Sequence, residues 1–269
     1  MNKLTNYTSE KIFVRLLTNK SKKNYWNYVG ELRKRKTNEI FKRSVLLTKS
    51  ESAKERMIGT DVLSQFGFPR LHKKEIITLF FDLLKSETNK NVINSILYGI
   101  GHNNEKLTNK QVELLCSFQN HKSVYIKHSL IFSLLTIEKN SAIDTLIKLS
   151  NDKDPHIRDW STFGIGSQIE TDNEKIRTAL WNRVSDKNNE TKFEAILGLA
   201  QRKDKQIKEV LKKELENIDE NGSPILESIE LLNDNEFIPF LEKKVLENKK
   251  SKKVNEDWLL DTINKLNEK

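Results

Sequence analysis

A short block that recurs at spacings of 37, 34, 31 and 34 residues constrains the fold of this chain more than any other feature. Each copy begins at a marker position that is followed, three and six residues later, by small or apolar residues. Repeats of this length are typical of helical hairpins that cannot bury their apolar faces alone and therefore stack on one another. The marker positions are Arg56, Ile93, Lys127, Arg158 and Lys192, and a sixth block begins near Leu226.

The composition agrees with an all-helical chain. Among 269 residues only 9 are Gly and 4 are Pro, so few positions interrupt a helix. Hydrophobic residues make up 36% and charged residues 32%, which fits an elongated protein with thin cores better than a compact globule. Apolar residues at helical spacing also mark a partner helix for each block, over 76–84, 112–118, 142–149, 176–184, 207–215 and 237–245.

We predict one solenoid domain over residues 1–269, in three parts. Residues 1–36 form basic N-terminal helices, residues 37–247 contain the repeats, and residues 254–269 form a C-terminal capping helix. The last helix combines an apolar stripe with many acidic and polar residues, which suits a polar outer face at the end of a stack. The polar run before it, residues 247–253, is predicted to form a solvated turn.

The fourth block shows the repeat most clearly. Asp152 and Asp154 favour a turn, and Pro155 is accepted in a first helical turn, where its missing N–H would have no partner. The small residues Ser161 and Gly164 then fall on one helical face. Such a face allows another helix to approach closely.

This block resembles the HEAT repeat. The family pattern is a turn containing Asp, often Asp-x-Asp-Pro, followed by Val or Ile, an Arg and a helix rich in Ala or Gly. The segment from Asp152 to Arg158 matches it closely, whereas Ile93 replaces the basic residue in another copy. Much of the chain is also similar to a group of bacterial HEAT-repeat proteins, some of them labelled by distant similarity to phycobilisome-lyase (PBS-lyase) repeats. The segments that carry this similarity are 31–41, 56–67, 97–102, 157–166 and 193–204.

The resemblance implies an all-α fold, a right-handed α-solenoid of six to seven HEAT-like hairpins whose second helices line a concave surface. It implies no enzymatic activity common to the group. Since a fold does not determine a function, and solenoids chiefly serve as binding surfaces, function has to be argued from individual residues.

Arg158 and Lys192 each follow a turn that contains an aspartate, Asp152 or Asp186. In HEAT arrays such pairs commonly form a ladder of ion pairs between adjacent repeats, and they also suit charge-assisted hydrogen bonds to the turn backbone. We predict this structural role for both residues. Phosphate binding by Arg158 is the alternative.

Asp159 and Trp160 match, in residue type only, the Asp and the aromatic residues with which HEAT-like alkylpurine DNA glycosylases engage a damaged nucleotide. Trp181 is a second candidate aromatic. Neighbouring positions on a helix point about 100° apart, so Asp159 and Trp160 do not both face one pocket squarely. We therefore favour packing for Trp160 and a hydrogen-bond acceptor role within the repeat for Asp159. Binding or catalysis by these residues stays open.

Positive charge is concentrated at the N-terminal end. Residues 1–50 contain 13 Lys and Arg against 3 Glu, whereas the remaining 219 residues contain 34 basic and 35 acidic residues. The formal net charge of +9 therefore comes from the N-terminal 50 residues. Any function of the positive charge is expected in that part of the chain.

The strongest part of this charge is the run Arg33, Lys34, Arg35 and Lys36. Aromatic residues, including Trp26, lie just before it, and aromatic and basic residues together are typical of nucleic-acid surfaces. Three interpretations stay open: Trp26 in the core beside solvated lysines, an acidic protein partner, or a nucleic acid.

No motif indicates a metal or a cofactor, and we predict neither. The five histidines show no HExxH or Cys/His spacing, and the one cysteine, Cys116, excludes an internal disulfide and is expected to be a buried small hydrophobe. No run approaches the roughly 18 apolar residues of a membrane span, and the N-terminus lacks a secretory signal. These absences predict a cytoplasmic protein without membrane contact.

Together these features favour a non-enzymatic protein-binding scaffold or adaptor, including an inhibitor or immunity-type protein, with a partner that has an acidic surface. The alternative is a nucleic-acid-binding protein, including an enzyme similar to the alkylpurine DNA glycosylases. The partner's identity and the oligomeric state do not follow from the sequence.

Overall fold

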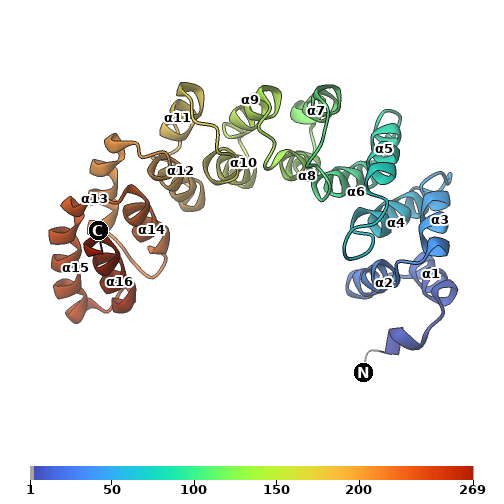
Figure 1. Ribbon diagram of the computed structural model, residues 1–269, viewed down its shortest axis with the longest axis horizontal. Helices are drawn as coiled ribbons and strands as arrows, with labels where there is room; N and C mark the ends of the chain where they lie inside the picture. Colours follow the sequence, from blue (N-terminus) through green and yellow to red (C-terminus); the bar gives the residue numbers. More distant parts are fainter. Residues whose placement is uncertain (1–2, 269) are drawn as a thin grey trace. The chain divides into compact units, whose positions relative to one another are not determined.

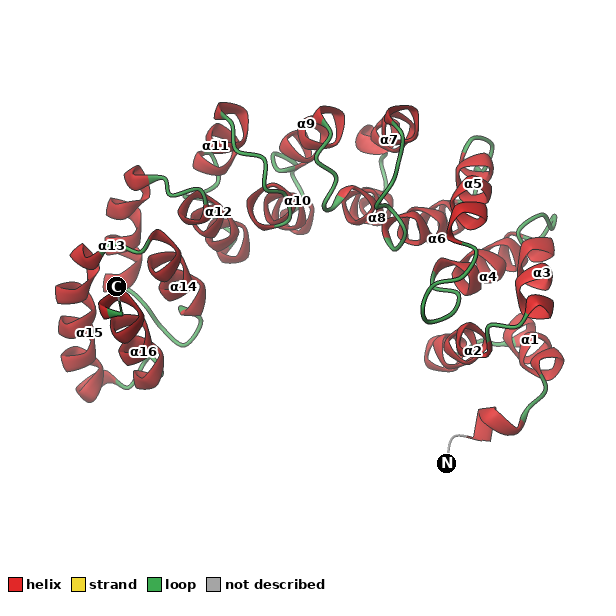
Figure 2. Cartoon of the chain, in the orientation of Figure 1, coloured by secondary structure: helices red, strands yellow, loops and turns green. Residues whose placement is uncertain are grey.

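The structure, a computed structural model, describes residues 3–268. Within this range it contains sixteen α-helices and four short 3-10 helices and no β-strand (Figures 1 and 2). The all-α prediction is confirmed. Contacts divide the chain between Leu135 and Thr136 into two compact units, called unit 1 and unit 2 below.

Unit 1 consists of four helical hairpins. In each hairpin the second helix packs against the second helix of the next, so α2, α4, α6 and α8 form one continuous layer. The helices are α1 (Ser9–Thr18), α2 (Lys22–Arg35), α3 (Asn38–Leu47), α4 (Ala53–Ser64), α5 (Lys73–Leu84), α6 (Lys90–Gly101), α7 (Asn109–Cys116) and α8 (Val124–Leu134), with 3-10 turns at Lys3–Asn6 (η1) and Ser117–Asn120 (η2).

Unit 2 repeats this arrangement with four further hairpins. Its second helices α10, α12, α14 and α16 pack in succession in the same way. The helices are α9 (Asn140–Leu149), α10 (Pro155–Ser167), α11 (Glu174–Trp181), α12 (Asn189–Gln201), α13 (Lys208–Glu216), α14 (Ser223–Leu232), α15 (Ile238–Ser251) and α16 (Glu256–Asn267), with 3-10 turns at Lys205–Ile207 (η3) and Asn235–Phe237 (η4).

The helix starts follow from local sequence. The Thr37 hydroxyl accepts a hydrogen bond from the Ile40 N–H, and the Asp154 carboxylate accepts from the N–H groups of His156 and Ile157. Such caps satisfy N–H groups that have no partner within the helix. Pro155 occupies the first turn of α10, as predicted.

The repeated face is buried in the contact between second helices. The residues three positions after the first five markers are Gly59, Ile96, Leu130, Ser161 and Ala195, and all five are buried. Burying a side chain such as Ile96 or Leu130 stabilises the fold by about 1.5–3 kcal/mol. The spacing in the sequence therefore reports the packing of one hairpin on the next.

α10 and α12 approach each other closely at two glycines. A Cβ atom built on Gly198 would stand 2.6 Å from the Cα of Gly166, and one built on Gly166 would stand 2.9 Å from the Glu194 carbonyl oxygen. Gly164, the glycine of the predicted small-residue face, is buried on the same helix, and Gly166 was not among the residues predicted.

The predicted turn before the last helix is shorter than expected, because α15 continues to Ser251. Residues 247–251 include no helix breaker, and the buried Asn248 side chain exchanges two hydrogen bonds with the backbone of Val254, at 2.8 and 3.1 Å. These bonds hold the chain end of α15 in a helix and place the next turn at residues 252–255.

Residues 3–268 form eight hairpins, more than the six to seven predicted, because α1 pairs with α2 and α15 pairs with α16 as further hairpins. One continuous domain over residues 1–269 stays a prediction. Among residues 3–268 no helix is both long enough and apolar enough to cross a bilayer.

Candidate binding surfaces

The basic run at the end of α2 does not present four free cations. The Arg33 guanidinium donates to the Asp61 carbonyl oxygen, 2.9 Å from its Nε, and burial lowers the Arg33 pKa. The Arg35 guanidinium pairs with Glu31 at 3.0 Å and also bonds to Ser9 and to the Leu4 carbonyl oxygen. Residues two apart lie on opposite flanks of a helix, and here the flanks face α4 and α1.

Only Lys34 and Lys36 of this run have exposed side chains. Lys36 lies at the helix end in the left-handed conformation, and its Nζ is 3.5 Å from the Phe68 carbonyl oxygen. The run therefore contributes two accessible charges. Arg33 and Arg35 hold α2 against its neighbours.

Near the start of α2, unit 1 has a cavity of about 540 Å³ between α2, α4 and α6, termed the α2–α4–α6 cavity. It is lined by amides, lysines, aromatic rings and one carboxylate, and residues from the α1–α2 turn complete it. The lining residues used below are Lys20, Lys22, Trp26, Asp61, Asn91 and Asn94.

Trp26 is not a core residue. Its side chain is 47% exposed, whereas the neighbouring Tyr28 and Val29 are buried and supply the packing of α2. The Trp26 ring stands edge-on to Tyr25, with centroids 5.2 Å apart, and the Arg33 guanidinium lies 5.8 Å from its centroid. Of the three interpretations of this stretch, the structure therefore excludes Trp26 in the core.

Asp61 lies at the buried side of the cavity. The Tyr25 hydroxyl donates to its carboxylate at 2.6 Å, and a bond from the Ser95 hydroxyl also holds its pKa down. Burial is nevertheless the larger influence and raises the pKa of Asp61. Burial likewise raises the pKa of Tyr25, which stays protonated as the donor.

In unit 2, Asp159 and Trp160 lie on α10. Burial, followed by the negative charge of Glu190, raises the pKa of Asp159 to about 6. No hydrogen bond reaches its carboxylate from residues 3–268, so the predicted acceptor role is wrong. Trp160 packs edge-on against Phe163 at 5.7 Å between centroids.

The surroundings of Asp159 are acidic. Glu194 on α12 has a raised pKa because of burial and the nearby charges of Asp159 and Glu227. A nucleic-acid backbone would meet repulsion on this surface, since phosphates approach proteins through Lys and Arg. This environment gives little support to a DNA-glycosylase role for Asp159.

Trp181 does not join this surface. It lies on the first helix α11, and its indole N–H donates to the Asp204 carboxylate at 3.1 Å. Its ring makes no contact with Trp160 among the interactions of residues 3–268. The predicted aromatic pair is therefore not assembled in the structure.

The predicted role of Arg158 in a ladder is confirmed. Its guanidinium pairs in bidentate fashion with Asp186 of the next repeat, at 2.8 and 2.9 Å, and donates to the carbonyl oxygens of Asp152 and Lys153. All of its nitrogens are used, which leaves little capacity for a phosphate. Lys192 instead pairs with Glu214 on α13 at 2.7 Å.

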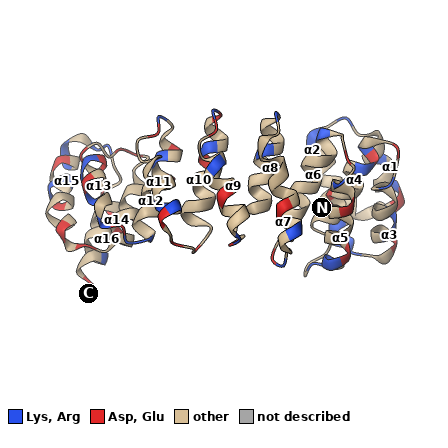
Figure 3. Ribbon diagram, turned by 90° about the horizontal axis from the view of Figure 1, so that it is seen from above, with Lys and Arg blue, Asp and Glu red and all other residues tan. Residues whose placement is uncertain are grey.

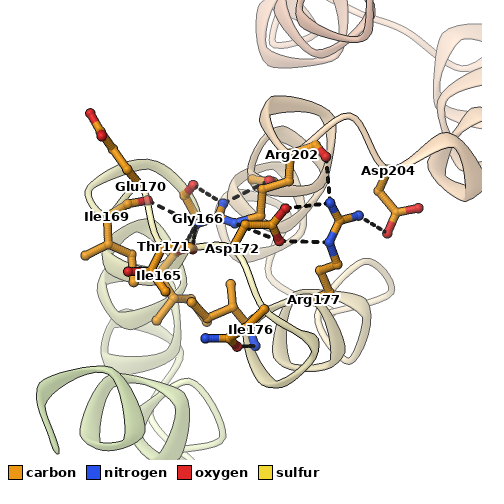
Figure 4. A network of polar contacts seen from close by, with 12 residues as sticks. Ile165, Gly166, Ile169, Glu170, Thr171, Asp172, Ile176, Arg177, Arg202 and Asp204 are labelled. Carbon is orange, nitrogen blue, oxygen red and sulfur yellow. Dashed lines mark hydrogen bonds and ion pairs between the residues drawn. The ribbon is translucent and has the colours of Figure 1, made fainter. Parts of the chain in front are cut away.

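Arg202 was not singled out by the sequence, yet its guanidinium is the most heavily hydrogen-bonded of unit 2 (Figure 4). It donates to the carbonyl oxygens of Ile165, Gly166 and Ile169, at 2.7–3.0 Å, and also to those of Gly198 and Thr171. These carbonyls end α10 and α12. Arg202 therefore closes helix ends and is not a ligand site, although an arginine in a turn carries no sequence signal of this role.

The histidines and the cysteine do not assemble a metal site. Among residues 3–268 no group of three His, Cys, Asp or Glu side chains is placed to hold a metal ion. Burial and the charges of Arg70 and Arg33 lower the pKa of His102 to about 4, so it is neutral at pH 7. Cys116 is buried.

Comparison with known proteins identifies the architecture. No protein-family model matches the chain. Over 121 residues it is 33% identical to the protein YibA of Escherichia coli K12, and this stretch covers 45% of the chain and 42% of YibA, less than half of that relative. The X-ray structure of YibA aligns over 100% of this chain and 95% of its own, with a TM-score of 0.78 at 23% identity.

The chain is an all-α solenoid of helical repeats. Its similarity is to a bacterial protein of the same fold, while the finer assignment to PBS-lyase HEAT repeats stays a prediction. Computationally designed armadillo repeat proteins align over 72% of the chain with a TM-score of 0.48 at 14% identity.

Proposed function

We propose that the chain is a protein-binding scaffold, and that the second helices of unit 1 engage an acidic partner. These helices, α2, α4, α6 and α8, contain nine Lys and Arg against three Asp and Glu. The corresponding helices of unit 2 contain three against eight. Figure 3 marks these charges along the ribbon.

The observation that carries the proposal is the exposed indole of Trp26 in a cavity with lysines on its lining. Exposed tryptophans surrounded by polar groups are typical of energetically important residues at protein interfaces. Lysines around such an anchor attract a partner of negative charge and raise its association rate.

Affinity capture from the native cells, quantified by mass spectrometry, tests the proposal. A variant that replaces four exposed lysines of unit 1 with Gln should fail to capture a protein that the wild type captures. That protein should bind the wild-type chain when both are purified. A control variant removes four exposed lysines from unit 2 and changes the net charge equally. The two sets are Lys22, Lys23, Lys34 and Lys36, and Lys243, Lys249, Lys250 and Lys253.

Equal recovery of every protein by wild type and both variants would contradict the proposal. Nucleic-acid binding is the other outcome that this experiment can reveal. It predicts recovery that disappears after nuclease treatment and an affinity that falls steeply with salt through counterion release.

A further inference from the structure

The α2–α4–α6 cavity is built for more than a diffuse contact with a charged surface. We infer that it binds a short, extended segment of polypeptide in which acidic and apolar side chains alternate. This inference rests on the proposed function and names the part of the partner that the cavity recognises. A volume of about 540 Å³ accommodates a few side chains and not a folded domain.

The lining of the cavity carries positive charge that is available to a ligand. Lys20 and Lys22 line the cavity, and neither ammonium forms an ion pair with any of residues 3–268. Lys54, also on the lining, donates to the Asn19 carbonyl oxygen at 3.3 Å. The Asp61 carboxylate does not cancel these charges for a ligand, because it is buried and hydrogen-bonded by Tyr25.

Two side-chain amides on one face of α6 also line the cavity. Asn91 and Asn94 are three residues apart, so they lie side by side on the helix. The Asn91 amide makes no hydrogen bond within residues 3–268, and the buried Oδ1 of Asn94 has no donor there. Turning the Asn94 oxygen toward a ligand therefore breaks no internal hydrogen bond.

An amide side chain has one acceptor and two donor hydrogens, which match the N–H and C=O groups of a peptide backbone. In an extended segment successive side chains point to opposite sides. Backbone groups then face Asn91 and Asn94 while one set of side chains reaches the lysines and the other reaches apolar surface.

The cavity also offers apolar surface to a ligand, from Trp26 and Met57. Trp26 is half-exposed, and its indole N–H donates to no acceptor among residues 3–268. Met57 lies on the same lining and adds a flexible apolar side chain. Together they suit a Leu or Ile side chain placed between two carboxylates. A nucleotide could use the lysines, the indole and, through a base edge, one of the amides, so nucleic acid is the competing occupant that the competition experiment tests.

Fluorescence anisotropy with a labelled eight-residue peptide of alternating Glu and Leu tests the inference on the full chain. We expect saturable binding that a peptide with Gln in place of Glu does not show. Trp26→Ala should weaken binding about tenfold, as expected for an interface anchor. The double change Asn91→Ala and Asn94→Leu should have a similar effect.

Two controls separate binding from folding. Trp258→Ala removes the tryptophan of α16, which is 38% exposed in unit 2, and should leave peptide affinity unchanged. Asn94→Leu should leave the denaturation midpoint unchanged or raise it, because it removes a buried acceptor without a donor.

Absence of saturable peptide binding would overturn the inference, as would binding that Trp26→Ala does not weaken. Competition by oligodeoxythymidylate for the same residues would assign the cavity to nucleic acid and would also overturn it. If the peptide fails while capture of a protein still depends on the four exposed lysines of unit 1, the cavity inference is wrong and the scaffold proposal stands.

Discussion

Arg56 in unit 1 and Arg158 in unit 2 make the same set of hydrogen bonds. Each guanidinium forms a bidentate pair with a carboxylate of the next repeat, Glu87 or Asp186, and donates to two turn carbonyl oxygens. In both turns the carboxylate also accepts from a backbone N–H. The frame of the two units is therefore alike.

The second-helix surfaces on this frame differ in charge and chemistry. The position directly after the marker is Met57 or Asn94 on the cavity of unit 1, but Asp159 or Phe193 in unit 2. Arg56 and Arg158, at the marker position, bind the next repeat. The residue after the marker lies at the surface and does not take part in these bonds. The comparison teaches that one packing frame supports surfaces of opposite charge.

The largest effect is expected from the frame itself. Arg158→Ala and Arg56→Ala should each lower the free energy of unfolding by about 3 kcal/mol, because each removes the bidentate guanidinium partner of a poorly exposed carboxylate and the donor to two turn carbonyl oxygens. Urea denaturation followed by circular dichroism measures the loss.

Lys192→Ala is the matched control for the arginine variants, since within residues 3–268 Lys192 forms one ion pair and no hydrogen bond to a carbonyl oxygen. It should cost about 1 kcal/mol. A loss for Arg158→Ala no greater than for Lys192→Ala would show that the ladder is not the common frame.

A smaller difference between the units is expected at their helix contacts. Gly198→Ala should destabilise unit 2 by about 2 kcal/mol, because the new Cβ meets backbone of α10. Gly99→Ala in unit 1 should cost about 1 kcal/mol, since the Cβ there meets side-chain atoms of Phe80 and Ser64, and side chains shift at lower cost than backbone.

Gly30→Ala provides the control for both glycine variants, because within residues 3–268 no atom beyond its chain neighbours and its own helical backbone lies within 4 Å of its built Cβ. It should raise stability by about 0.5 kcal/mol through the helix propensity of Ala. Thermal denaturation should rank the three variants in this order, and equal effects at Gly30 and Gly198 would refute the packing argument.

The smallest effect concerns the acidic surface of unit 2. The pKa of Asp159 in the folded chain is about 6, above the ordinary value of 3.8. Between about pH 4 and pH 6 the Asp159 carboxyl binds a proton more tightly in the folded than in the unfolded state. The contribution of Asp159 to stability therefore falls as pH rises through this range. Asp159→Asn should raise stability at pH 7 by about 1 kcal/mol, allowing for solvent screening.

The gain from Asp159→Asn should disappear at pH 4, where Asp159 is protonated in the folded chain. Denaturation midpoints at pH 4 and pH 7 check this, with Asp257→Asn on the exposed start of α16 as the control. A gain of equal size at both pH values would show that charge at Asp159 is not the cause.

Much of the fold could be predicted from the sequence because it rests on local patterns. The spacing of the markers located six second helices, and Asp154 with Pro155 located the start of α10. The bond from Arg158 to Asp186 also followed, since both residues occupy fixed places in the repeat. The equivalent bond of Arg56 was not predicted; its partner in the structure is a glutamate, Glu87, where the repeat pattern has an aspartate.

The candidate site depended on contacts that no local pattern contains. The sequence predicted Arg33 and Arg35 as binding residues. In the structure their guanidinium groups are hydrogen-bonded to neighbouring segments, Arg33 to Asp61 and Arg35 to Leu4. Trp26 and Asn94 are 68 positions apart in sequence and meet only because α2, α4 and α6 are successive second helices.

The sequence by itself determined the repeat, the helices and the buried faces, because these depend on the period of apolar residues and on turn chemistry. Tertiary structure alone decided which charges are used inside the protein and which are left for a partner. The physical reason is that a guanidinium or an amide is available for binding only when neighbouring helices leave its hydrogen-bonding groups unused, and stacking of the hairpins settles this.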